Sequence, residues 1–291
     1  MADSTGQVFS PGNFQELFSI WNRFGNAGLF AGGVEIIREQ GQVVPTFPGE
    51  IISLHKIEEL GKIRRSERYL EIGAMVKLSQ IVNLGKMVPE ALRNCVMHIG
   101  DPQIRNLATI GGNICNPSRR LDASAPMNIL DAQYELRTAQ SSRWISASRF
   151  SSLPGPPVLA RQEVLTRIRV PLEPWTYTWY RKFKTSGSNS PGGLIILIVR
   201  IQKNVLSNIR VIYSDRIILR DKSSENILEG KHLPLERKDT RVFVDRWKAY
   251  MSTFQGIENS VFSGTGANFN PELVKTQILN FIESTLMYIS D

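Results

Sequence analysis

The sequence predicts an α+β fold in three parts. Short helical and extended segments alternate through the first two parts, whereas the last part opens with long runs of β-branched and aromatic residues and closes with two helices. A chain of 291 residues with 42% hydrophobic content is long enough for two or three compact units. We therefore expect two αβ subdomains, residues 1–55 and 56–173, and a C-terminal domain, residues 174–291, made of an antiparallel sheet with helices.

The first subdomain is expected to alternate helices and short strands. Residues 13–24 carry apolar side chains at helical spacing. The short apolar run Leu29–Ala31 reads as extended, and Gly32-Gly33 ends it. A second helix is expected over Val34–Gln40, and residues 51–54 read as a further extended piece.

The second subdomain is expected to begin with an extended stretch over Tyr69–Ala74. A helix is predicted over Pro89–Ile99, because proline suits the first turn and Gly100 follows as a stop signal. Residues 100–122 form the stretch richest in glycine, polar and basic residues. Two further strands are expected over residues 134–138 and 163–171.

The C-terminal domain is expected to contain an antiparallel sheet. Three long runs over residues 177–183, 194–201 and 205–213 are joined by short polar turns, which is typical of antiparallel strands. Helices are predicted over residues 241–254 and 271–289.

The charge of the chain excludes some classes of partner. A net charge of +8 and a pI near 9.6 could attract nucleic acid. Basic and acidic residues are interleaved, however, and no nucleic-acid-binding signature accompanies them, so we expect an anionic cofactor or an acidic partner subunit instead. No apolar run approaches the roughly 20 residues of a membrane span, and no secretory signal opens the chain. We expect a cytoplasmic protein without a membrane span.

The two cysteines, Cys95 and Cys115, cannot build a metal or iron–sulfur site alone. They lack CxxC spacing and a nearby histidine pair. We expect two reduced thiols and no metal site on this chain.

Two glycine pairs are candidates for binding an anion. Gly32-Gly33 and Gly111-Gly112 each follow an apolar stretch, and neither fits the dinucleotide-binding GxGxxG pattern. Paired glycines permit positive φ and remove Cβ atoms, so successive N–H groups can converge on a pyrophosphate. The alternative for each pair is a tight turn that ends a strand. A third run, Gly264-Thr265-Gly266, lacks a third glycine and is rejected as a nucleotide site.

The flanking residues carry a family resemblance. IGDPQIRNLATIGGNI (residues 99–114), LFAGGVEI (residues 29–36), YLEIGAMVKLS (residues 69–79) and SSENILEGK (residues 223–231) occur in the order found in FAD-binding domains of the molybdopterin dehydrogenase family. Xanthine dehydrogenase and the medium subunit of carbon monoxide dehydrogenase belong to that family. The resemblance implies a vanillyl-alcohol-oxidase-like (PCMH-type) FAD-binding fold, in which two αβ subdomains hold FAD between them and a C-terminal domain follows.

The same resemblance implies a set of cofactor contacts. The two glycine-rich loops would surround the pyrophosphate and ribityl chain, Ile99 would face the flavin ring, and Asp122, Leu165 and Lys184 would make further contacts. For Asp122 a solvated loop acid or a helix cap is the alternative. The full expected set is Leu29, Phe30, Ala31, Gly32, Gly33, Val34, Glu35, Ile36, Ile99, Thr109, Ile110, Gly111, Gly112, Asn113, Asp122, Leu165 and Lys184. No catalytic side chain is expected, because FAD brings the redox chemistry itself.

The resemblance further implies an electron-transfer subunit. A molybdopterin-binding large subunit and a 2Fe-2S small subunit would be its partners, and electrons would pass through FAD to NAD or another acceptor. Two segments depart from the family pattern, residues 116–122, where the family has a Ser-Pro pair, and residues 185–193, where it has arginine and acidic positions. These departures leave room for a flavin-free scaffold or assembly subunit, and a self-contained FAD-dependent oxidase is the other alternative.

Overall fold

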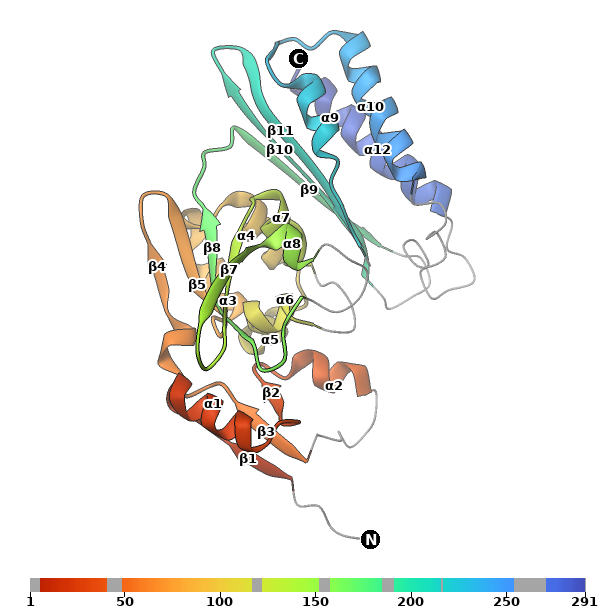
Figure 1. Cartoon of the computed structure of the whole chain (residues 1–291). Coiled ribbons are helices and arrows are strands. Elements are labelled where there is room, and N and C mark those ends of the chain that lie inside the picture. Colours follow the sequence, from red (N-terminus) through yellow and green to blue (C-terminus); the bar gives the residue numbers. More distant parts are fainter. Residues whose placement is uncertain are drawn as a thin grey trace. The chain divides into compact units, whose positions relative to one another are not determined.

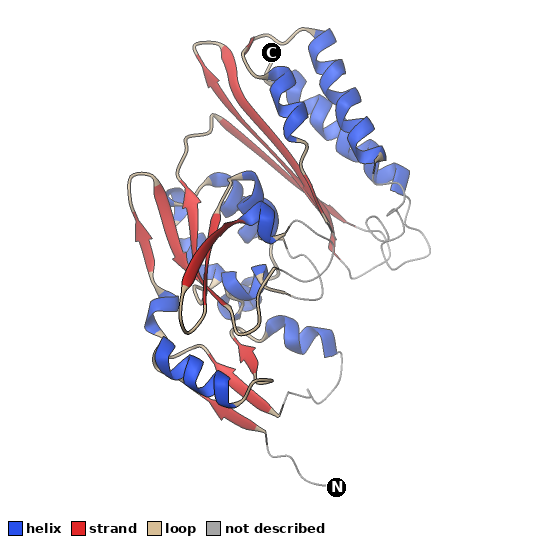
Figure 2. Cartoon of the chain, viewed as in Figure 1, coloured by secondary structure: helices blue, strands red, loops and turns tan. Residues whose placement is uncertain are grey.

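The chain forms two compact units, residues 1–172 and residues 173–291. The computed structural model describes residues 6–40, 49–116, 122–151, 158–184, 191–215, 217–253 and 271–290. Each unit combines helices and sheet, as Figures 1 and 2 show. The three-part division at residues 55 and 173 stays a prediction, and each unit is described by itself below.

The first unit opens with a small parallel sheet. Its strands lie in the order β1 (Gln7–Phe9), β3 (Glu50–Ser53) and β2 (Gly28–Phe30), and both pairings are parallel. Because parallel strands need crossover connections, α1 (Phe14–Arg23) and α2 (Val34–Gln40) link them. The side chain of Asn13 caps α1 by accepting a 2.9 Å hydrogen bond from the amide of Glu16. Helix α1 buries Phe14, Leu17 and Phe18.

The rest of the first unit is built on a five-stranded antiparallel sheet. Its strand order is β4 (Ile63–Arg65), β5 (Tyr69–Gly73), β8 (Val164–Pro171), β6 (Gln133–Arg137) and β7 (Ser142–Ser146). The accompanying helices are α3 (Leu78–Asn83), α4 (Glu90–Met97), α5 (Pro102–Leu107), α6 (Ile110–Ile114), α7 (Ser124–Ile129) and α8 (Ala147–Phe150), with short 3₁₀ turns over Glu58–Gly61 and Gly85–Met87.

Side chains alternate between the two faces of this sheet. The buried face is apolar and includes Leu70, Ile72, Tyr134, Leu136, Ile168 and Val170. On the other face Arg167 pairs with Glu135 and Glu71, and the guanidinium of Arg169 lies 4.2 Å from the ring centroid of Trp144. A sheet with one apolar face and one charged face fits an antiparallel layer that covers a core on one side.

The second unit is an antiparallel sheet covered by helices. The strand order is β12 (Ile218–Leu219), β11 (Val205–Ser214), β10 (Pro191–Gln202) and β9 (Tyr177–Lys184), and β13 (Lys231–His232) pairs with β11. The helices are α9 (Lys222–Leu228), α10 (Arg237–Ser252) and α12 (Pro271–Tyr288). Their apolar side chains, such as Phe243, Trp247 and Ile282, join those of the sheet in one core.

The hairpin between β10 and β11 turns on two residues. Lys203 and Asn204 have φ angles of 49° and 63°, as a two-residue turn that follows the strand twist requires. Residues 194–199 of β10 are buried without a break. The prediction of long antiparallel strands followed by helices is confirmed for this unit. Helix α9 was not predicted from the sequence.

Candidate functional site

The two glycine-rich segments meet in the folded first unit. A Cβ atom added at Gly32 would overlap the carbonyl of Leu107 and lie 3.1 Å from the Cα of Ala108. A Cβ atom added at Gly112 would lie 3.8 Å from the Cβ of Ala31. The two segments, far apart in the sequence, are therefore neighbours in space.

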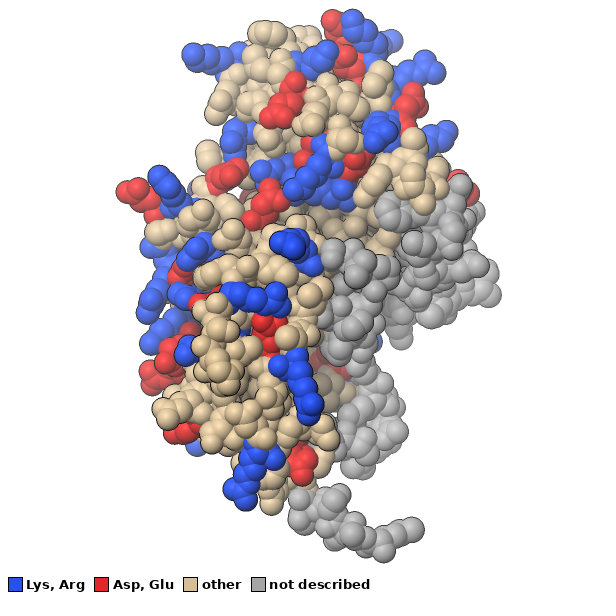
Figure 3. All heavy atoms as spheres, in the orientation of Figure 1, with Lys and Arg blue, Asp and Glu red and all other residues tan. Residues whose placement is uncertain are grey.

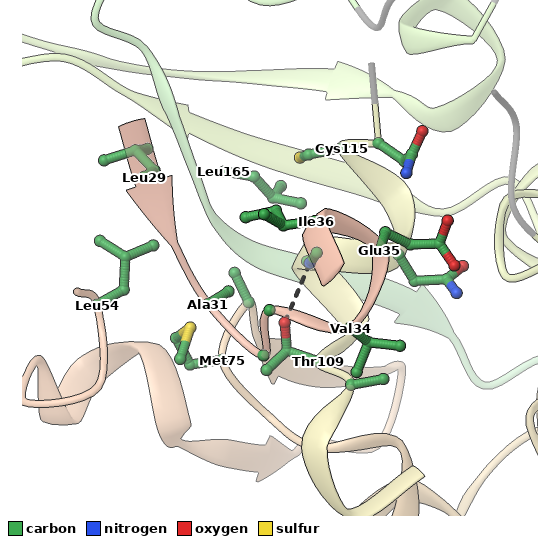
Figure 4. A pocket seen from close by; sticks show the side chains of 18 of the residues that line it. Leu29, Ala31, Val34, Glu35, Ile36, Leu54, Met75, Thr109, Cys115 and Leu165 are labelled. Carbon is green, nitrogen blue, oxygen red and sulfur yellow. Dashed lines mark hydrogen bonds between the residues drawn. The ribbon is translucent and has the colours of Figure 1, made fainter. Parts of the chain in front are cut away.

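A pocket of about 350 Å³ lies beside this meeting point, and Figure 4 shows many of the side chains around it. It is bounded by the β2–α2 segment, by α5 and α6, and by the start of β8. The expected contact residues that line it are Leu29, Ala31, Gly32, Gly33, Val34, Glu35, Ile36, Ile99, Thr109, Gly111, Gly112, Asn113 and Leu165. The structure thus gathers most of the predicted residues around one cavity.

Four expected residues are placed differently. The ring of Phe30 packs against Gly33, since a Cβ atom added at Gly33 would lie 2.5 Å from that ring. Ile110 is fully buried, and its amide donates to the carbonyl of Val76. Asp122 is outside the lining, and its carbonyl accepts hydrogen bonds from the Cys95 thiol and the Ala125 amide. Lys184 ends β9 in the second unit, and its side chain is outside the described residues.

The first wall is the turn between β2 and α2. Gly33 has a φ of +71°, in the left-handed region that favours glycine, and this conformation lets the strand pass directly into the helix. The carbonyl of Gly33 accepts a 3.1 Å hydrogen bond from the amide of Ile37. The amides of a first helical turn have no partner within the helix, so the start of α2 brings donor groups to the edge of the pocket.

The second wall corrects the sequence prediction. The interpretation of Gly111-Gly112 as a glycine-rich turn is wrong, because these glycines lie inside helix α6, and neither uses the positive φ that glycine permits. The hydroxyl of Thr109 caps the helix by accepting a 3.1 Å hydrogen bond from the Gly112 amide, drawn as the dashed line in Figure 4. A Cβ atom at Gly111 would lie 2.6 Å from the carbonyl oxygen of Ala74. Glycine is required there by close backbone packing.

The remaining lining is largely apolar. Ile99, Ile104 and Leu165 contribute aliphatic side chains, a surface that suits a flat aromatic group. The guanidinium of Arg105 donates hydrogen bonds to the carbonyls of Ile99 (3.1 Å) and Gly100 (2.7 Å). This side chain fixes the loop that presents Ile99 to the pocket.

Two side chains of the lining can ionise, and the surroundings of each fix its protonation state at neutral pH. Burial raises the pKa of the Cys115 thiol to about 12, so the group stays protonated at neutral pH and is a poor nucleophile. Glu163 accepts a paired hydrogen bond from Arg143, and that bond lowers the pKa of its carboxyl. Cys95 and Cys115 are both reduced thiols.

Several lining residues were not in the expected set. Ala74, Met75, Ile104 and Ala108 line the pocket and fall within the motifs that carried the resemblance, so motif membership could have found them. Leu54 and the later residues Cys115, Asn116, Leu159, Glu163 and Val164 belong to none of these motifs.

The two segments that depart from the family pattern lie mostly outside the described residues. Residues 117–121 and 185–190 lie outside the described residues, as does Gly264-Thr265-Gly266. Within the described ranges, no group of three or more His, Cys, Asp or Glu side chains is arranged to hold a metal ion. No helix in the described part of the chain combines the length and apolar character of a membrane span.

The fold and the site define a class of protein. A pocket in the first unit, lined from the segments that follow the small parallel sheet and from the five-stranded sheet with its helices, and a second sheet-and-helix unit agree with the PCMH-type FAD-binding fold, so the predicted fold class is confirmed. Residues 4–173 match the model of the FAD binding domain in molybdopterin dehydrogenase. This match covers more than half of the chain, and the chain therefore belongs to that family, as the sequence motifs had indicated.

Individual relatives agree with this assignment. The chain is 30% identical over 161 residues to the xanthine dehydrogenase FAD-binding subunit of Escherichia coli O157:H7, a match that covers 54% of this chain and 55% of the relative. It is also 30% identical over 179 residues to the carbon monoxide dehydrogenase medium chain of Afipia carboxidovorans, which covers 60% of this chain and 62% of the relative. The match to the first relative thus spans little more than half of that protein's length.

Solved structures extend the likeness of fold to the whole chain. Quinoline 2-oxidoreductase from Pseudomonas putida 86 superposes with a TM-score of 0.80 at 16% identity, covering 100% of this chain and 98% of that one. Carbon monoxide dehydrogenase from Hydrogenophaga pseudoflava gives the same TM-score and coverage at 21% identity. At these identities the likeness shows the fold alone.

Proposed function

We propose that this chain binds FAD in the pocket of its first unit and acts as the electron-transfer subunit of a heteromeric molybdenum hydroxylase. Electrons would come from iron–sulfur clusters on a partner subunit and leave through FAD to NAD or another acceptor. The observation that carries the proposal is one cavity walled by two distant glycine-rich segments, in a chain whose residues 4–173 belong to an FAD-binding family.

The residues of the pocket suit the parts of FAD. Residues 29–36 and 109–113 line the same pocket, because the glycines let their backbones pack closely, and we expect the pyrophosphate and ribityl chain of FAD to lie along these two segments. The aliphatic side chains of Ile99, Ile104 and Leu165 offer a surface for the flavin ring. When bound, FAD supplies the redox reactivity, while the chain binds it, orients it and keeps water from it. Asp122 and Lys184 remain proposed contacts.

The wider assembly is part of the proposal. The relatives are named as a FAD-binding subunit and as a medium chain, which supports a complex with a molybdopterin-binding large subunit and a 2Fe-2S small subunit. On the face seen in Figure 3, basic and acidic side chains are interleaved. An overall charge of +8 with mixed local charge favours an anionic cofactor or an acidic protein partner.

Purification tests the cofactor directly. We expect a yellow protein whose visible spectrum is that of a flavin, and we expect denaturation to release FAD, identified against FMN by chromatography. Colourless protein that takes up no added FAD would contradict the proposal and favour the flavin-free scaffold. Titrating FAD into protein stripped of flavin, with FMN and ADP as competitors, would show which parts of the cofactor the pocket recognises.

The partner is tested by co-purification from the native host. We expect molybdenum and iron–sulfur absorbance to accompany the chain. A flavin-loaded chain that purifies alone and oxidises a substrate with oxygen would instead identify a self-contained oxidase.

A further inference from the structure

One side of the pocket is closed by a short segment, residues 158–163, that we call the strap. The strap leads into β8 and, with the first residues of that strand, places Leu159, Glu163, Val164 and Leu165 in the lining. No motif of the sequence marks it, and its role must be read from its contacts.

The strap is fixed to the five-stranded sheet through Glu163. The two carboxylate oxygens accept hydrogen bonds of 2.7 and 2.8 Å from the guanidinium of Arg143 on β7. One of these oxygens also accepts a 2.9 Å hydrogen bond from the amide of Ala160. The Glu163 side chain is only 3% exposed, so a partly formed network would leave a buried charge without compensation.

The strap is also fixed to the first subdomain. The side-chain amide of Gln162 donates a 2.8 Å hydrogen bond to the carbonyl of Trp21 in α1. Gln162 has a φ of +55°, a conformation that a glutamine adopts only when its surroundings hold it. The guanidinium of Arg161 lies beside Gly25, just after α1, at 3.3 Å from the position of an added Cβ atom.

The six residues of the strap therefore connect the two αβ subdomains whose walls enclose the pocket. We propose that the strap holds these subdomains at the spacing that the cofactor requires, with Arg143, Gln162 and Glu163 as its positioning residues. The inference rests on the proposed function for the identity of the cofactor. Its physical basis is preorganisation, because a pocket held at its working width spends less binding free energy on ordering its walls.

The first experiment measures FAD dissociation from the full chain. Arg143→Met and Glu163→Gln each remove the paired hydrogen bond, and we expect the dissociation rate to rise about tenfold, the scale of one lost charge-assisted hydrogen bond. Gln162→Ala keeps the backbone strain but loses the contact with Trp21, and we expect a rise of about threefold. Arg143→Lys retains the charge and should restore part of the loss.

The chain offers a matched control. Arg167 makes a similar paired hydrogen bond to Glu135, at 3.0 and 2.9 Å, on the charged face of the same sheet, and neither residue lines the pocket. Arg167→Met should lower the Tm by a comparable amount and leave FAD dissociation within about twofold of the wild type. If FAD dissociated equally faster from Arg143→Met and from Arg167→Met, the proposal would be overturned. The faster dissociation would then follow from lower stability of the whole unit and not from the strap.

A second measurement needs no cofactor. Hydrogen exchange of flavin-free protein should rise in Arg143→Met and Gln162→Ala across residues 20–36 of the first subdomain as well as in the strap. In Arg167→Met the exchange of residues 20–36 should stay at the wild-type level. Exchange that rises in the strap alone would refute a linking role. Should the wild type bind no FAD, the proposed function fails, while hydrogen exchange still decides whether the strap joins the subdomains.

Discussion

The two glycine pairs of the pocket look alike in sequence and differ in structure. Gly32-Gly33 ends a strand, and Gly33 adopts a left-handed conformation that leads into α2. Gly111-Gly112 lies within α6, has ordinary helical geometry and is packed against Ala74. Gly33 answers a demand on backbone conformation, whereas Gly111, like Gly32 against Leu107, answers a demand for space. Substitutions at Gly33 and at Gly111 should therefore fail in different ways.

The largest effect is expected at Gly111. In Gly111→Val the Cβ atom would lie 2.6 Å from the carbonyl oxygen of Ala74 and 2.7 Å from its Cβ atom. Since backbone must move, we expect the free energy of unfolding to fall by at least about 3 kcal/mol, with FAD lost because the fold is lost. Thermal unfolding of flavin-free protein is the measurement. Gly61→Val is the control, since a Cβ atom there meets nothing within 4 Å, and a Tm for Gly111→Val as high as that of the control would contradict the packing account.

A smaller effect on the fold is expected at Gly33. In Gly33→Ala the left-handed conformation costs about 1–2 kcal/mol, and the Phe30 ring must shift away from the new methyl group. We expect FAD affinity to fall by more than this stability loss accounts for, because Gly33 lines the pocket. Gly33→Asn separates the two causes, since asparagine tolerates the left-handed region. Equal affinities for the Ala and Asn variants would mean that contact with Phe30 outweighs backbone conformation.

The cap of α6 should contribute less than either glycine. Thr109→Val keeps the shape of the side chain and removes the hydroxyl that accepts from the Gly112 amide, so we expect a loss of about 1 kcal/mol in the free energy of unfolding. Thr109→Ser retains the hydroxyl and should stay near the wild type. Urea unfolding of the three proteins measures the difference. A Ser variant as unstable as the Val variant would contradict the capping account, because a retained hydroxyl would then not preserve stability.

The smallest effect is expected from pH, and it should not distinguish the two glycine pairs. Arg143 lowers the pKa of Glu163, so this carboxylate stabilises the fold fully above its unfolded pKa of about 4.3. That contribution is lost as the pH falls through the lowered pKa of the folded state. The Tm of the wild type should therefore drop more steeply below about pH 4 than that of Glu163→Gln. Parallel Tm curves for the two proteins would show that Glu163 does not carry this dependence.

The sequence predicted those elements whose signal is local. Helix α2 was expected over the same residues, Val34–Gln40, because glycines and a regular apolar pattern mark its start. Helix α6 was missed because two glycines each cost about 1 kcal/mol in a helix, a penalty that the Thr109 cap and the packing on Ala74 offset in the folded chain. Helix propensity depends only on a residue and its neighbours in sequence, so it does not predict such a contact between distant segments.

The candidate site shows the same limit. The expected residues that line the pocket lie within motifs, with Leu165 as an exception that the resemblance supplied. Glu163 and Leu159 were missed, because the strap that carries them is held by contacts with residues outside it, Glu163 with Arg143 and Gln162 with Trp21. The side chains that set the spacing of the subdomains are the ones that no short pattern encodes.

Strand β10 carries a consequence for handling the protein. Residues 194–199 read Leu-Ile-Ile-Leu-Ile-Val, and none of these side chains is more than 1% exposed. Six uncharged residues of high β-propensity without proline form the kind of segment that assembles into intermolecular sheets when it is uncovered. Arg200 follows at once and acts as a gatekeeper at one end only. Loss of the native state should therefore lead to aggregates rather than to soluble unfolded chains, and variants that unfold should be recovered in the insoluble fraction of the cell lysate.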